Sequence, residues 1–168
     1  MTNMQKFEFK GGIYEGEALN GVPHGKGRLT VGDSFYDGDF VDGKHHGRGE
    51  TLVEGLFRAD GIWSEHRFVE GRVTYMGEYL YRLGCEPETV YEGKFENFFL
   101  VGKGKIIKPN GEIFVGEFLE GKPHGEGKLT LCDGSVVKGT WNNGVKCYEY
   151  TDDDYKNSGG DERFCKKA

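Results

Sequence analysis

The chain has 168 residues, of which 29 are glycine, and its formal net charge is −6. Nucleic-acid binders need a basic patch or stripe, so this acidic balance argues against a nucleic-acid partner, and it disfavours an anionic membrane surface. Residues 1–10 lack the apolar run of a signal peptide, and no stretch approaches the roughly 18 apolar residues of a spanning helix.

The sequence is organised as an array of repeats. Residues 6–13 alternate apolar and polar side chains and end in a glycine pair, which predicts a leading strand and an N-terminal cap over 1–13. Units with glycine at their third position then begin at positions 14, 36, 59, 91, 114 and 137, with an aromatic residue first at 14, 36, 91 and 114. The spacings are 22 or 23 residues on either side of an irregular middle over 57–90. We therefore predict about seven repeats over 14–147 and a separate acidic tail over 148–168.

Each unit is too short for a pair of helices, so a β-hairpin is the expected structure. In the first unit, period-two alternation pairs Tyr14 with Leu29 and Gly16 with Gly27, between short strands over 14–18 and 25–29. A glycine beside each ring leaves room for the ring to lie across the neighbouring strand.

The opposite face of each hairpin is expected to be charged. The same alternation places Glu15 across from Arg28 and Glu17 across from Lys26. In the fifth unit it places Lys94 across from Lys103, so these pairs are expected to aid solubility more than stability. A further unit is expected to open at Tyr75, followed by a loop over 80–90.

The pattern Tyr-x-Gly-x-aromatic, then Gly and His-Gly-x-Gly-x-Leu, resembles the MORN repeat (membrane occupation and recognition nexus) over about residues 7–147. The resemblance implies an all-β fold, an elongated and curved single-layer antiparallel sheet of successive hairpins. It also implies a non-catalytic role in scaffolding or partner binding, in some members with membranes or phosphoinositides.

An aromatic stripe is the first candidate binding site. Because a single-layer sheet has no second layer to cover its apolar face, we expect a groove that holds a helix or an extended peptide. The alternative is that the rings only stack on each other and on the glycines. The expected groove residues are Tyr14, Tyr36, Phe40, Trp63, Tyr75, Tyr79, Tyr91, Phe95, Phe114, Phe118 and Trp141.

The stretch Phe98-Phe99-Leu100-Val101 is the second candidate, because it replaces the polar turn of other units with an apolar one. Two interpretations remain open: packing under the loop over 80–90, or a docking site for a partner or a second copy. A lipid-binding alternative rests on the lysines, for which the plausible cluster is Lys94, Lys103, Lys105 and Lys108.

No catalytic set, cofactor or metal site is predicted. His24, His46 and His124 fill equivalent positions, but equivalent residues of adjacent hairpins lie roughly 9–10 Å apart, too far for one zinc ion. Turn-stabilising hydrogen bonds are expected for them instead.

The cysteines are Cys85, Cys132, Cys147 and Cys165, and their spacing predicts free thiols in a reducing compartment. Lys146 to Thr151 could add a last strand. The expected function is a cytoplasmic interaction scaffold for a protein partner in a cytoskeletal or ciliary assembly, with homo-oligomers allowed. The alternatives are a phosphoinositide-binding module and a regulatory subunit of a separate enzyme.

Overall fold

The computed structural model describes residues 3–76 and 87–147. They form one antiparallel sheet of 13 strands, in which spatial neighbours are also consecutive in the chain. These ranges contain no helix that could cross a membrane. The strands are β1 (Asn3–Phe9), β2 (Gly12–Leu19), β3 (Val22–Val31), β4 (Ser34–Val41), β5 (Lys44–Val53), β6 (Phe57–Ser64), β7 (Arg67–Tyr75), β8 (Val90–Glu96), β9 (Phe99–Ile107), β10 (Ile113–Leu119), β11 (Lys122–Thr130), β12 (Val136–Asn142) and β13 (Val145–Lys146).

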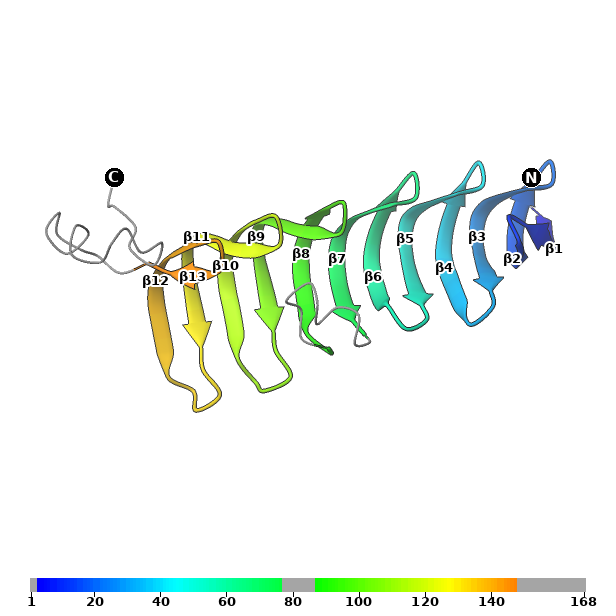
Figure 1. The fold of residues 1–168 in the computed structure, drawn as a ribbon. Coiled ribbons are helices and arrows are strands. Elements are labelled where there is room, and N and C mark those ends of the chain that lie inside the picture. Colours follow the sequence, from blue (N-terminus) through cyan, green and yellow to red (C-terminus); the bar gives the residue numbers. More distant parts are fainter. Residues whose placement is uncertain (1–2, 77–86, 148–168) are drawn as a thin grey trace, which may run out of the picture.

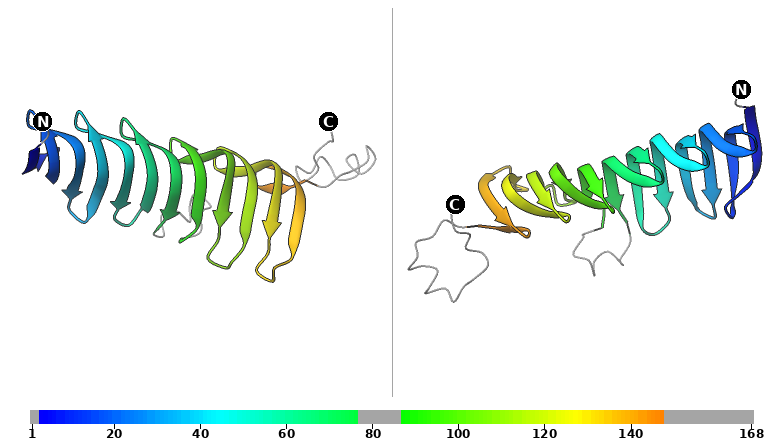
Figure 2. Two further views of the ribbon diagram at one scale, coloured as in Figure 1. Left: turned by 180° about the vertical axis from the view of Figure 1, so that it is seen from behind. Right: turned by 90° about the horizontal axis from the view of Figure 1, so that it is seen from above.

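The sheet is elongated and its strands are strongly curved (Figures 1 and 2). The N-terminal strand lies at one end of the array and β12 and β13 lie at the other. The all-β, single-layer fold expected from the sequence is confirmed. We call the two faces inner, where the aromatic rings gather, and outer.

The hairpins that follow β1 in the chain, β2–β3 to β12–β13, each have a two-residue tip after the even-numbered strand. Both tip residues have positive φ, as in a type I′ turn: Asn20 and Gly21 have φ values of 52° and 76°. The connecting turns follow the odd-numbered strands and lie at the opposite edge of the sheet (Figure 1).

Both strands of the first hairpin are longer than expected, because their pairing continues to the tip. A β-bulge makes this possible. The register shifts between Gly16 and Ala18, and Gly25 on the partner strand has a φ of 89°, a conformation that glycine adopts without strain. The first glycine of the His-Gly-x-Gly motif is therefore needed for the bulge, and the second for the ring.

Part of the expected register is correct. The pairs Tyr14 with Leu29, Gly16 with Gly27 and Glu15 with Arg28 are all present. The bulge explains the two errors, since in these two hairpins it shifts the pairing of every residue nearer the tip by two positions. The expected pairing of Glu17 with Lys26 is absent from the register, and Lys94 pairs with Val101 instead of Lys103.

The irregular middle also differs from the expectation. Tyr75 does not open a new hairpin but ends β7, and β8 begins at Val90. The remainder of the unit expected there, Tyr79 included, lies outside the described residues, as do most of the expected loop and the acidic tail.

An unbroken row of paired glycines crosses the sheet from β2 to β12. Each glycine lies directly opposite the next, including those of the two hairpins whose sequences had diverged most. We call this row the glycine ladder. Its members are Gly16, Gly27, Gly38, Gly49, Gly61, Gly71, Gly93, Gly104, Gly116, Gly127 and Gly139.

The cysteine expectation needs a correction. Cys132 is a free, exposed thiol, but Cys147 is disulfide-bonded, with a partner outside the described residues. The spacing of cysteines in the sequence did not indicate this bond, and it weakens the argument for a reducing compartment.

Candidate interaction surfaces

The expected aromatic stripe is present on the inner face as one packed cluster. Neighbouring rings meet edge to face, as in Tyr14 with Phe40 (5.1 Å between centroids) and Phe114 with Trp141 (4.9 Å). The buried cluster contains Tyr14, Tyr36, Phe40, Ala59, Trp63, Phe68, Val73, Phe95, Leu100, Phe114, Phe118 and Trp141. Phe68 and the two aliphatic residues from β6 and β7 were missed by sequence reasoning, because their repeat had lost its His-Gly.

These rings do not line an open groove. Tyr14 is 0% exposed and Phe114, the most accessible ring of the buried cluster, is only 6% exposed. Because the strands curve, residues from opposite edges of the sheet meet over the cluster. Phe98, in a hairpin tip, packs on Phe57 beside a connecting turn (4.9 Å), and its carbonyl accepts a hydrogen bond from the Tyr75 hydroxyl (2.8 Å).

A narrower apolar strip remains accessible on the inner face. It consists of half-buried side chains that pack against the buried cluster, and two of the expected groove residues, Tyr75 and Tyr91, belong to it. We call it the half-buried strip; its members in β6 to β11 are Phe57, Tyr75, Tyr91, Ile106 and Leu129. The surface that a partner could touch is therefore this strip, and the buried rings support it from below.

The apolar stretch at the fourth hairpin tip divides between the two faces. Phe98 and Leu100 join the inner cluster, where Leu100 is 1% exposed. Phe99 points outward, is 57% exposed and lies against Gly121 of the next tip. Packing thus explains two of the residues, and Phe99 is the most exposed of the four.

The glycine ladder and the rings fit each other closely. A Cβ at Gly27 would overlap the Tyr14 ring, and one at Gly127 would overlap the Phe114 ring. The Tyr14 hydroxyl donates a hydrogen bond to the Glu17 carbonyl (2.6 Å). Burial, assisted by the nearby Glu17 carboxylate, raises the pKa of Tyr14 to about 12.

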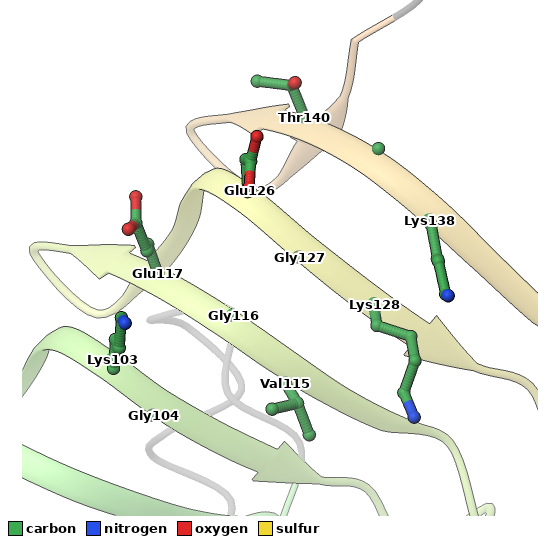
Figure 3. A pocket seen from close by; sticks show the side chains of 11 residues that line it. Lys103, Gly104, Val115, Gly116, Glu117, Glu126, Gly127, Lys128, Lys138 and Thr140 are labelled. Atoms are coloured by element: carbon green, nitrogen blue, oxygen red, sulfur yellow. The ribbon is translucent and has the colours of Figure 1, made fainter.

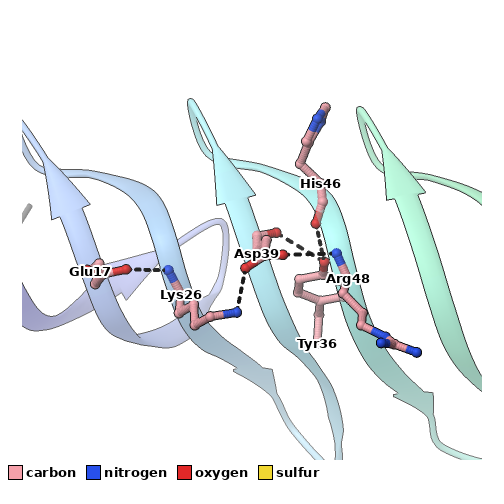
Figure 4. A network of polar contacts seen from close by, with 6 residues as sticks. All are labelled: Glu17, Lys26, Tyr36, Asp39, His46 and Arg48. Atoms are coloured by element: carbon pink, nitrogen blue, oxygen red, sulfur yellow. Dashed lines mark hydrogen bonds and ion pairs between the residues drawn. The ribbon is translucent and has the colours of Figure 1, made fainter.

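Carboxylates beside the bulges bind backbone amides. The Lys26 amide donates to Glu17 (2.7 Å) and the Arg48 amide donates to Asp39 (2.9 Å), as Figure 4 shows. Although burial alone would raise the pKa of Asp39, the hydrogen bonds from Lys26 and the Arg48 amide hold it below its usual range. Acidic residues at these positions thus have a structural role, which the sequence pattern did not reveal.

The three equivalent histidines behave differently from one another. His24 accepts a long hydrogen bond (3.5 Å) from the Asp42 amide, in the next tip rather than its own. His46 is exposed, and the buried Nδ1 of His124 has no hydrogen-bond partner among the described residues. The expectation of a shared turn-stabilising bond is therefore wrong for His124.

A different pair of histidines, His45 and His66, makes defined contacts. His45 occupies the position that Pro23 and Pro123 hold in other hairpins, and its ring stacks on Tyr36 at 3.7 Å. Its amide donates to Nδ1 of His66 (3.2 Å), which stands in a tip with a φ of 68°. Burial, with the nearby charges of His66 and Lys10, lowers the pKa of His45 to about 4.

The outer face changes in character along the array. Beside the glycine ladder, on the side of the connecting turns, runs a row of outward-facing residues that we call the lower outer row. Arg28 and Arg72 in this row pair with Asp37 (3.1 Å) and Glu92 (2.9 Å). The row reads Glu15, Arg28, Asp37, Glu50, Asp60, Arg72, Glu92, Lys105, Val115, Lys128 and Lys138.

A shallow hollow of about 610 Å³ lies on the outer face of β9 to β12, where this row becomes basic (Figure 3). Val115, Lys128 and Lys138 border it on one side of the glycine ladder. Lys103, Glu117, Glu126 and Thr140 border it on the other.

The four lysines of the lipid-binding alternative are only partly free. Lys105 lies 3.4 Å from Glu92, and Lys108 lies 3.0 Å from Glu112, whose pKa it lowers through a hydrogen bond. Lys94 and Lys103 form no ion pair within the described residues. No group of three or more metal-ligating side chains occurs in this part of the chain either.

Comparison with known proteins agrees with this geometry. No curated protein matches the chain. A family model described as the MORN repeat matches residues 14–33, 36–51, 91–113 and 114–136. The two hairpins outside these matches, β6–β7 and β12–β13, continue the same sheet and register. The chain is therefore a MORN-repeat protein.

Proposed function

We propose that the protein is a non-catalytic interaction scaffold that holds a helix or an extended segment of a protein partner on its inner face. MORN repeats are generally protein or membrane interaction modules, and proteins built from them are typically non-catalytic. The observation that carries the proposal is the half-buried strip over β6 to β11, an apolar surface whose side chains stay partly accessible.

The partner contacts the half-buried strip and not the buried rings. Tyr91 and Ile106 face each other across β8 and β9, and both keep part of their side chains accessible. An apolar side chain of the partner would bury area here at roughly 25 cal/mol per Å². The charged outer rows would add little to this affinity, since exposed ion pairs contribute about 0–1 kcal/mol.

Affinity capture from native cytosol tests this proposal. The variant Tyr91→Ser/Ile106→Ser should lose a partner that the unchanged protein retains. Val115→Ser, an exposed outer-face substitution, is the control and should retain it. Each variant must show a cooperative thermal unfolding transition; equal capture by a folded double variant would refute the assignment of the inner face.

A second candidate function is binding to an anionic membrane surface through the outer face, which Lys94 and Lys103 favour. Co-sedimentation with vesicles containing phosphoinositide should then vanish in Lys94→Glu/Lys103→Glu. Retained sedimentation of this variant, or none by the unchanged protein, would exclude these lysines as the site.

The cellular setting is also part of the proposal. We place the scaffold in the cytoplasm, in a cytoskeletal or ciliary assembly, on the association of such repeats with these structures. Identification of the captured partner tests this placement, and enzyme activity that co-purifies with the partner would favour a regulatory subunit instead.

A further inference from the structure

Lys128 and Lys138 form an unmatched pair of positive charges on the outer face. They lie directly opposite each other on β11 and β12, which places two like charges on neighbouring strands. Such pairs destabilise a sheet. Neither lysine has an ion-pair partner in the described ranges, and the third neighbour in the row, Val115, is uncharged. Figure 3 shows both side chains on the same border of the hollow.

The other cations of the lower outer row are matched. Arg28, Arg72 and Lys105 each have a carboxylate within 3.4 Å on an adjacent strand. The register of the sheet therefore supplies an acidic neighbour everywhere in this row except at its C-terminal end. A carboxylate from outside the described sheet would complete the pattern at Lys128 and Lys138.

The described sheet ends beside this hollow, and acidic residues follow in the sequence. The amide of Cys147 donates a hydrogen bond to the carbonyl of Thr140 (2.8 Å), and Thr140 borders the hollow together with Lys138. The residues that follow read Tyr148-Glu149-Tyr150-Thr151-Asp152-Asp153-Asp154-Tyr155. They are acidic and aromatic, which suits the one border of the hollow that Lys128, Lys138 and Val115 form; Val115 is 44% exposed.

We propose that residues 149–154 bind in this hollow, with carboxylates of Asp152 to Asp154 against Lys128 and Lys138. Asp152 lies five positions after Cys147 in the sequence, which gives a reach of up to about 17 Å. Lys138 lies two residues from Thr140 along β12, about 7 Å away, and Lys128 lies one strand further, about 5 Å. A segment tethered this closely has an effective concentration in the millimolar range.

The bound segment makes the hollow a carboxylate-binding site that the chain occupies itself. An acidic partner must displace residues 149–154 to reach Lys128 and Lys138. The proposal concerns the outer face only, so it stands or falls independently of the partner proposed for the inner face.

Lysine reactivity in the full-length, non-reduced protein tests the proposal. Each lysine is labelled briefly with an amine-reactive ester, and mass spectrometry gives its rate. In Asp152→Asn/Asp153→Asn/Asp154→Asn, Lys128 and Lys138 should be labelled several-fold faster than in the unchanged protein. The matched control Asp161→Asn/Glu162→Gln, in the same tail, should leave both rates unchanged, as should Lys6 in every variant.

Carbodiimide cross-linking of an equal mixture of ¹⁵N-labelled and unlabelled protein identifies the occupant. The expected product joins Asp152, Asp153 or Asp154 to Lys128 or Lys138 within one chain, and it disappears in 1 M salt, where the Debye length is about 3 Å. Equal lysine rates in all variants would overturn the proposal. Cross-links only between two chains would overturn it in favour of a second copy as the occupant.

Discussion

The N-terminal part of the array, β1 to β7, and the C-terminal part, β8 to β13, share an inner face but differ on the outer one. Ring packing and the glycine ladder continue through both. The cations of the N-terminal part, however, are matched, Arg28 by Asp37 and Arg72 by Glu92 of β8, whereas Lys128 and Lys138 lie opposite each other with no carboxylate partner among the described residues. The inner face therefore maintains the fold in both parts, while the charges of the outer face vary along the array and are available for binding.

The largest expected effect tests whether the inner face is equivalent in the two parts. Phe40 and Phe118 occupy matching positions, and both are almost fully buried. We expect Phe40→Ala and Phe118→Ala each to lower the free energy of unfolding by about 3–5 kcal/mol, because each leaves a cavity. Urea denaturation measures this, and a loss below 1 kcal/mol at Phe118 alone would break the equivalence.

Substitution of ladder glycines gives the next largest effect. Gly27→Ala and Gly127→Ala should each cost about 1–3 kcal/mol, because the added methyl group overlaps the Tyr14 or Phe114 ring. Gly21→Ala is the control: it has open space but a φ of 76°, so it should cost only about 1–2 kcal/mol, the price of a left-handed conformation. Equal stability of the ladder variants and the unchanged protein in urea would contradict the ring-over-glycine packing.

The half-buried His45 makes the N-terminal part sensitive to acid. Its pKa is about 4 in the folded protein against 6.5 in the unfolded chain, so the unfolded chain binds the proton more readily. The free energy of unfolding should therefore fall as the pH decreases from about 6.5 towards 4. His45→Pro, which copies Pro23 and Pro123, should flatten this part of the thermal-stability profile. An unchanged profile in that variant would exclude His45 as the cause.

Outer-face charges should give the smallest effects in both parts. Arg28→Ala removes an exposed ion pair and should cost about 0–1 kcal/mol. If residues 149–154 bind at Lys128 as proposed above, Lys128→Ala should likewise cost about 0–1 kcal/mol in urea denaturation. A gain of about 0.2–1 kcal/mol would show that the like-charge pair is uncompensated and would contradict that proposal.

Periodicity was enough to predict the inner face. Side chains alternate along a strand, so the spacing of Tyr14, Gly16 and Gly27 in the sequence was sufficient for the correct face and pairing. The bulge could not be predicted, because the amino-acid sequence does not distinguish a glycine needed for positive φ, such as Gly25, from one needed under a ring, such as Gly27.

Burial of the rings was beyond sequence reasoning for a different reason. It depends on strand curvature, a property of the whole sheet, which brings Phe98 to Phe57 across 41 positions of the chain. Phe98 could nevertheless have indicated this contact, because of its place in a hairpin tip. Phe98 and His66 replace the usual tip glycine despite φ values of 65° and 68°, and both side chains pack on residues distant in sequence or in another hairpin.

The curved hairpins close over the aromatic cluster and leave half-buried side chains, not the buried rings, for a partner. Nuclear Overhauser effects between the rings of Phe98 and Phe57 test this closure most directly, because these rings meet only if a tip folds over to the opposite edge. We predict strong cross-peaks in the free protein. Their absence, together with rapid chemical labelling of Tyr14 and Tyr36, would show an open aromatic trough and contradict the account.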